Sequence, residues 1–139
     1  MIAVDSDILT LVAHGHPGTL VQWNAVTPAD RGLPVVVADE ATRGRLSLIR
    51  QAEAAQAKIS LPRAYALFQE TLDMIAQLVS LPYTDAAESL FQQWRQAKIR
   101  IGTNDLRVAA VAVANNAKLV TRNARVLQQV PGLQLEIWS

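Results

Sequence analysis

Short apolar runs that each end in a polar side chain are the feature that most limits how this chain can fold. The run Ile2-Ala3-Val4 is followed by Asp5, Val35-Val36-Val37-Ala38-Asp39 by Glu40, and Lys118-Leu119-Val120-Thr121-Arg122 by Asn123. Runs of this kind are typical of buried parallel strands. Because ligand sites in open α/β sheets lie where strands end, we expect Asp5, Glu40 and Asn123 to meet at one edge of a sheet.

Helical patterns separate these runs. A long helix is predicted from Glu40 to about Lys58, and a second helix follows Pro62 and ends before Leu81-Pro82, so the two form a hairpin. A third, nearly all-apolar helix begins near Thr103, carries Asp105 in its first turn and must be buried. Strands that alternate with helices predict an α/β fold, a central, mostly parallel β-sheet flanked by α-helices.

Composition limits the class of protein further. A chain of 139 residues, half of them hydrophobic, can bury a proper core, and we expect a single domain over residues 1–139. The absence of cysteine excludes disulfides and thiolate chemistry and suits a cytoplasmic protein. The apolar segment 8–13 is too short to span a bilayer, so no membrane association is expected.

Charge distribution favours a phosphate-bearing substrate. The net charge of +1 is too small to indicate nucleic-acid binding by itself. Arginines nevertheless gather near the proposed acidic edge, at Arg43, Arg45, Arg50, Arg122 and Arg125. Guanidinium groups beside a metal site suit a phosphate ligand, although single exposed arginines on helices are usually ordinary solvated side chains.

The acidic residues themselves predict a metal site. Carboxylates gathered at one edge repel one another, and a hard divalent cation bound through oxygen holds them ionised together. We therefore expect Mg²⁺, or Mn²⁺, on Asp5, Glu40 and Asp105. Each acid taken singly also fits a helix cap or a favourable charge in a first helical turn, and for Asp7 the capping role is favoured.

The chain resembles PIN domains, specifically the toxin nucleases of VapBC toxin–antitoxin modules, over nearly its whole length. Four segments carry the resemblance: Ile2-Ala3-Val4-Asp5-Ser6-Asp7-Ile8-Leu9, Val36-Val37-Ala38-Asp39-Glu40-Ala41-Thr42-Arg43-Gly44, Gly102-Thr103-Asn104-Asp105-Leu106-Arg107-Val108-Ala109-Ala110 and Leu119-Val120-Thr121-Arg122-Asn123. Their order and spacing together are specific to this family. The resemblance implies a PIN-like nuclease domain with Asp5, Glu40, Asp105 and Asn123 as catalytic residues.

Function and partners follow from the same resemblance. It implies a metal-dependent endoribonuclease toxin that hydrolyses phosphodiester bonds in RNA, forms a homodimer and is neutralised by a cognate VapB-like antitoxin. The antitoxin segment would occupy a groove formed largely by the helical hairpin, about residues 40–80, and an antitoxin arginine would enter the acidic site. A bound ion would lower the pKa of a water molecule and stabilise charge on the phosphate.

Asn123 departs from the family pattern, in which many members place an aspartate there or a few residues later. Asparagine can orient a metal-bound water or coordinate through its carbonyl oxygen, so we expect retained activity with a weaker metal site, with Asp7 supplying the missing charge. The alternative is a catalytically weakened PIN-fold module that binds RNA or protein. Asp5-Ser6-Asp7 also resembles the paired aspartates of haloacid dehalogenase-like phosphohydrolases, but that reading leaves Glu40 without a role.

Overall fold

The sheet is parallel throughout and has the strand order β3-β2-β1-β4-β5 in the computed structural model, which describes residues 1–138. Its strands are β1 (Ile2–Val4), β2 (Arg31–Pro34), β3 (Val79–Leu81), β4 (Lys118–Thr121) and β5 (Leu135–Ile137). The first strand therefore lies in the middle of the sheet, between β2 and β4. The predicted α/β architecture is confirmed.

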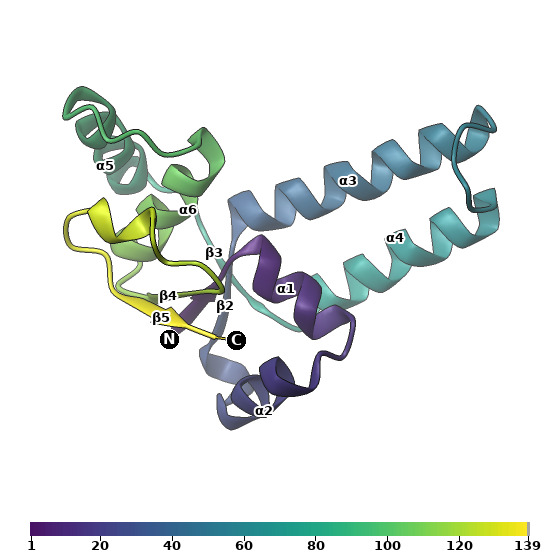
Figure 1. Ribbon diagram of the computed structural model, residues 1–139, viewed down its shortest axis with the longest axis horizontal. Coiled ribbons are helices and arrows are strands. Elements are labelled where there is room, and N and C mark those ends of the chain that lie inside the picture. The colour runs from purple at the N-terminus through teal and green to yellow at the C-terminus, as the bar shows by residue number, and fades with distance from the viewer. Residues whose placement is uncertain (139) are drawn as a thin grey trace.

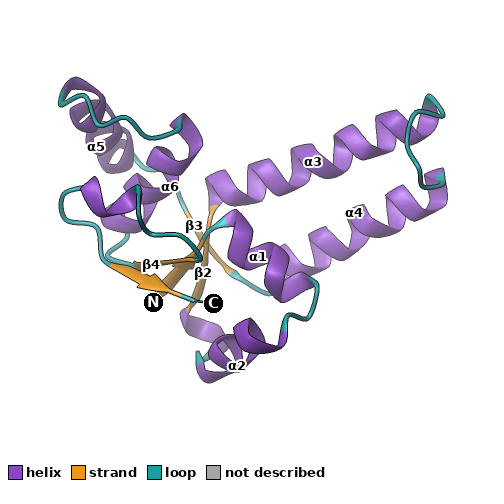
Figure 2. Ribbon diagram, in the orientation of Figure 1, coloured by secondary structure: helices purple, strands orange, loops and turns teal. Residues whose placement is uncertain are grey.

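Helices cover the sheet from both sides, as Figures 1 and 2 show, with α5 and α6 on one side of the view and the remaining helices on the other. The helices are α1 (Ser6–Ala13), α2 (Pro17–Ala25), α3 (Val35–Glu53), α4 (Leu61–Ala76), α5 (Asp85–Gln96) and α6 (Thr103–Ala114). Single 3₁₀ turns occupy Pro28–Asp30 and Leu127–Gln129. Among the described residues, none of these helices is both long and apolar enough to cross a membrane.

The core is centred on α6 and the central strands. Leu106 and Val111 of α6 are fully buried, as are Val4 of β1 and Leu119 and Val120 of β4. The nearly all-apolar helix predicted from Thr103 is therefore present and buried. Its alanines, Ala109, Ala110 and Ala112, are also fully buried, and such small side chains let the helix approach the sheet closely.

The predicted strand at Val35–Ala38 is wrong, because these residues form the first turn of α3 and the strand lies just before them, at Arg31–Pro34. Valine runs favour strands, but Val37 is fully buried and Val36 and Ala41 pack against the core at helical spacing. The segment just before α3 pairs as a strand although it contains Gly32 and Pro34, which strands usually disfavour. A Cβ atom at Gly32 would lie 2.6 Å from the Ile2 carbonyl oxygen, so only glycine allows β1 and β2 to pair here.

Helices α3 and α4 form the predicted hairpin, which extends away from the sheet in Figure 1. The Arg45 Nε donates a hydrogen bond to Thr71 Oγ1 at 2.9 Å and thus joins the two helices. Ile49 and Ala64 are buried on the hairpin but lie outside the main hydrophobic cluster. The outer part of the hairpin is therefore held by its own contacts and not by the core.

Candidate functional site

A polar cleft of about 350 Å³ lies where β1 and β4 end and α6 begins. It is lined by Asp5, Asp7, Arg100, Ile101, Gly102, Asp105, Thr121, Asn123, Val126 and Leu127. Three of the four predicted site residues, Asp5, Asp105 and Asn123, therefore meet in one cleft although they are far apart in the sequence. Parallel strands bring this about, because β1 and β4 pair side by side and end at the same edge.

Asp5 holds its place through backbone contacts on both sides. Its N–H donates to the Val120 carbonyl oxygen at 3.3 Å, which ties it to β4. Its side-chain Oδ1 accepts from the Ile8 N–H at 3.0 Å, which makes Asp5 the N-cap of α1. Asp7 was favoured as a cap from the sequence, but Asp5 takes that role, and the exposed Asp7 lines the cleft instead.

Glu40 occupies a different position from the one predicted. It lies in the second turn of α3, not at the end of a strand, and it lines the pockets next to the cleft. The Ser6 hydroxyl donates a hydrogen bond to Glu40 Oε2 at 3.5 Å, so α1 and α3 meet at this side chain. Helix α3 thus brings Glu40 toward the acidic cleft from the hairpin side.

The acidic side chains act on one another electrostatically. Burial raises the pKa of Asp5, the charges of Asp7 and Asp105 raise it further, and the nearby Thr121 hydroxyl and the Ile8 N–H oppose the change. Burial also raises the pKa of Glu40, and the next largest cause is the charge of Asp105. Glu40 therefore shares an electrostatic environment with the cleft acids although it does not line the cleft.

The donors suit a hard cation that keeps much of its own water. Within the described residues, no three acidic or histidine side chains are gathered closely enough to hold a metal ion by themselves. The cleft does offer three carboxylates, Asp5, Asp105 and the exposed Asp7, together with the Asn123 amide oxygen, and these are all oxygen donors. Mg²⁺ is commonly bound by one or two carboxylates, several waters and the phosphates of a substrate. The residues fit such a site and not a cage built wholly by the protein.

The arginines singled out from the sequence do not line the cleft. Arg43 forms an exposed ion pair with Asp39 at 2.9 Å, and Arg45 lines the neighbouring groove. The cleft contains Arg100 instead, from the loop between α5 and α6. Sequence reasoning missed this residue because it belongs to no motif and lies in a segment without strand or helix periodicity.

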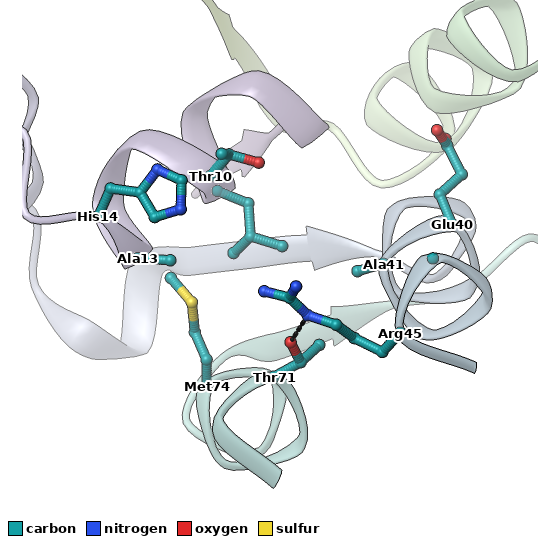
Figure 3. A pocket seen from close by; sticks show the side chains of 10 residues that line it. Thr10, Ala13, His14, Glu40, Ala41, Arg45, Thr71 and Met74 are labelled. Carbon is teal, nitrogen blue, oxygen red and sulfur yellow. Dashed lines mark hydrogen bonds between the residues drawn. The ribbon is translucent and has the colours of Figure 1, made fainter. Parts of the chain in front are cut away.

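A second, more apolar groove of about 350 Å³ lies between α1, α3 and α4. Leu9, Thr10, Ala13 and His14 line it from the first helix and its C-cap, Glu40, Ala41, Gly44 and Arg45 from α3, and Thr71 and Met74 from α4. Figure 3 shows Glu40 at one end and His14 at the other, with Arg45 directed between them and bonded to Thr71. Glu40 therefore lines this groove and is also affected by the charge of Asp105 in the acidic cleft.

Comparisons with known proteins agree with this fold. No model of a known protein family matches the chain. Ribonuclease VapC2 of Rickettsia felis is 46% identical over 44 residues, which are 32% of this chain and 33% of that relative. The matched segment thus spans about a third of the length of the curated relative.

Solved structures match over the whole chain. The structure of VapBC2 from Rickettsia felis bound to a promoter DNA fragment has a TM-score of 0.74 at 22% identity, with both chains fully covered. VapBC-1 from nontypeable Haemophilus influenzae has a TM-score of 0.77 at 19% identity and covers 99% of this chain and 98% of its own. DNA-bound VapBC from Salmonella typhimurium has a TM-score of 0.76 at 17% identity with full coverage of both. The predicted resemblance of the fold to proteins of VapBC complexes is confirmed.

Proposed function

We propose that this chain is a single-domain, Mg²⁺- or Mn²⁺-dependent endoribonuclease toxin that acts in the cytoplasm, hydrolyses phosphodiester bonds in RNA and is neutralised by a VapB-like antitoxin. The observation that carries the proposal is the meeting of Asp5, Asp105 and Asn123 in one polar cleft. The cleft belongs to a fold shared with solved VapBC complexes, and part of the sequence matches a ribonuclease named VapC2.

Asp5 and Asp105 would hold the ion in the cleft, and Glu40 would act on it through a bound water from the α3 side. When bound, the ion supplies an acidified water and neutralises charge that develops on the phosphate. The raised pKa values of Asp5 and Glu40 support this arrangement, because they mark carboxylates that are partly buried and near other negative charges. A cation would favour their ionised forms.

Two neighbouring side chains would keep the acids in position. Ser6 bonds Glu40, and the Thr121 hydroxyl lies near Asp5. Asn123 Oδ1 accepts from the Arg125 N–H at 3.2 Å, and the N–H of Asn123 donates to Thr121 Oγ1 at 3.3 Å. Because its oxygen is already bonded to the backbone, we assign the Asn123 NH₂ group the task of donating to a substrate or water oxygen.

The groove between α1 and the hairpin would receive the antitoxin. Its lining combines apolar side chains such as Leu9 and Met74 with one cation, Arg45, and one acid, Glu40. A peptide segment with an apolar side chain, an acidic group for Arg45 and a basic group for Glu40 would match this surface. A basic side chain of the antitoxin that lay beside Glu40 would also favour the ionised forms of the acids and compete with the metal ion. The homodimer implied by the family resemblance stays a prediction.

The first test is cleavage of single-stranded RNA by the purified protein with Mg²⁺, with Mn²⁺ and with a chelator. The wild-type chain should cut with either metal and not with the chelator, and Asp5→Asn should not cut. Asp73→Asn is the matched control, since it removes the same charge from an exposed position on α4 that bonds only Gln69. Cleavage that persists in Asp5→Asn, or in the chelator, would contradict the proposal.

A binding module without catalysis is the second candidate. Two observations favour it: Asn123 stands where many family members carry an acid, and no three acidic groups within residues 1–138 are arranged to hold a metal ion by themselves. This candidate predicts that wild-type protein and Asp5→Asn bind RNA equally and that neither cuts it. A labelled RNA, followed both for binding and for cleavage, separates the two candidates in one experiment.

A further inference from the structure

Arg100 is a basic side chain within an otherwise acidic cleft. It is exposed and lines the cleft together with Asp5, Asp7 and Asp105. Within residues 1–138 it forms no ion pair within 4.0 Å, even though carboxylates line the same cleft. A guanidinium group in this setting is free to bind an anion that enters the cleft.

Arg95 holds the backbone on both sides of Arg100. Its Nη1 donates to the Ile99 carbonyl oxygen at 3.2 Å and to the Ile101 carbonyl oxygen at 2.9 Å. Its Nη2 donates to Thr103 Oγ1 at 3.1 Å. These bonds fasten the loop to the first residue of α6, the helix that carries Asp105 in its first turn.

Two further contacts support this loop. The Arg95 guanidinium lies 5.2 Å from the centre of the Phe91 ring, and Phe91 is buried in the core. Ile101, next to Arg100, is also buried. Lys98, at the start of the loop, has a φ of 61°, a conformation that a side-chain-bearing residue adopts at some energetic cost. The surrounding contacts offset that cost and keep the loop in one shape.

The consequence for binding is that the backbone position of Arg100 is set before any ligand arrives. A guanidinium group can donate two parallel hydrogen bonds to a phosphate, and it remains charged at any physiological pH. A loop held in advance avoids the entropy that a flexible backbone would lose on binding, so only the Arg100 side chain has to become ordered. The acids of the same cleft would repel an RNA phosphate unless a cation, either the ion or Arg100, lay beside it.

We propose that Arg100 binds a backbone phosphate of single-stranded RNA beside the acidic cleft, and that Arg95 is a positioning residue that holds Arg100 through the Ile99 and Ile101 carbonyl oxygens. This inference rests on the proposed function, since it assigns a role within the same RNA-binding cleft.

The test measures binding of a fluorescent single-stranded RNA to Asp5→Asn protein, which does not cut, at several salt concentrations. Adding Arg100→Ala should raise Kd about tenfold and reduce the slope of log affinity against log salt by about 0.7, the value for one phosphate contact on a single strand. Arg50→Ala is the matched control, because Arg50 is exposed in the last turn of α3 and outside the cleft lining. It should leave Kd and slope unchanged.

The positioning role has its own measurement. Arg95→Ala should weaken RNA binding nearly as much as Arg100→Ala. The double variant should bind RNA no more weakly than Arg100→Ala alone, because both substitutions remove the same contact between Arg100 and the phosphate. In the cutting protein, both should raise KM more than they lower kcat. Thr103→Ala removes one of the three hydrogen bonds that Arg95 donates, and it replaces Arg95→Ala in the test if that variant does not fold. It should raise KM by a smaller factor than Arg95→Ala.

Opposite outcomes are distinguishable. If wild-type protein cuts RNA but Arg100→Ala matches Arg50→Ala in Kd and salt slope, the role of Arg100 is refuted and the nuclease proposal stands. If Arg95→Ala and Thr103→Ala fold and bind as the parent does, the positioning role is refuted. If wild-type protein neither binds nor cuts RNA, the proposed function fails, and this inference fails with it.

Discussion

The acidic cleft and the helical hairpin are built in opposite ways. The cleft is formed at the ends of β1 and β4 and the start of α6, and the residues behind it, such as Val4, Val120 and Leu106, are fully buried. The hairpin extends from the sheet, and beyond its base only Ile49 and Ala64 are buried. The geometry of the cleft therefore depends on the whole core, whereas most of the hairpin surface can change with little effect on folding.

The largest effect should follow from changes to the cleft acids. Asp105→Asn should lower cleavage of single-stranded RNA about a thousandfold, since it removes a proposed metal ligand. The variant should remain folded, because Asp105 is exposed and lies at the edge of the core. Cleavage rates and a urea unfolding curve on the same preparation test both statements. If the variant lost activity only because it was less stable, Asp105 would have a role in folding and not in cleavage.

A comparison of two leucines measures how far the regions differ in stability. Leu106→Ala, at a fully buried position of α6, should lower the free energy of unfolding by about 2–5 kcal/mol. Leu46→Ala, on α3 at 38% exposure, should lower it by about 0.5 kcal/mol or less. Urea denaturation of both variants gives the two values. Similar losses in the two variants would show that the hairpin is as tightly coupled to the core as α6 is.

The pH dependence of stability should come from the cleft. The pKa of Asp5 is raised above its ordinary value of 3.8, chiefly by burial, so its ionised form is less favourable in the folded chain than in the unfolded one. The stability that Asp5 contributes is complete below that value and is lost as the pH rises through the raised pKa. Asp5→Asn keeps a good N-cap and should remove this part of the decline, which begins above about pH 4.

Added Mg²⁺ provides the complement to that measurement. Because the ion favours ionised carboxylates, it should raise the melting temperature of the wild-type chain at pH 7 and have less effect at pH 4. Asp5→Asn should show a smaller rise at pH 7. Equal rises in the two proteins would mean that the ion does not bind at this cleft.

The smallest expected effect lies on the hairpin. Gly44 is in the middle of α3, and a Cβ atom there would meet nothing within 4 Å, so Gly44→Ala should stabilise the fold by about 0.5–1 kcal/mol. Gly44 also lines the groove, so the added methyl group should weaken binding of the antitoxin proposed for this groove. Thermal unfolding and antitoxin titration test the two effects separately. Gly32→Ala is the contrast within the sheet, where the close approach of Ile2 makes the same substitution destabilising.

Much of the architecture could be predicted because local pattern and tertiary environment agree. The strand at Lys118–Thr121 and the helix from Thr103 occur where they were expected, since an apolar run and an apolar helix have few ways to be buried. The segment 31–38 was misread because the two levels disagree there. Gly32 and Pro34 favour neither strand nor helix by propensity, and close contact with β1 made the first four residues a strand and left the valines to α3.

The residues of the candidate site could likewise be predicted only where the local sequence pattern agrees with the tertiary environment. Asp5, Asp105 and Asn123 could be placed together because each lies beside a buried element that the pattern identified. Glu40 was selected for the wrong structural reason, since it follows a helical turn and not a strand. Arg95 and Arg100 could not be found, because hydrogen bonds to backbone carbonyl oxygens depend on the shape of a loop and leave no spacing in the sequence.

The position of Glu40 also bears on how the proposed toxin and its antitoxin could evolve. This side chain lies at the base of the hairpin, at the end of the groove, and shares the electrostatic environment of Asp105. Under the proposed function, a variant that escapes neutralisation by replacing Glu40 would also lose a residue proposed to act on the metal ion. Resistance to the proposed antitoxin would therefore arise at groove positions outside the acidic cleft, such as Arg45 or Met74, where a change should leave the proposed nuclease intact.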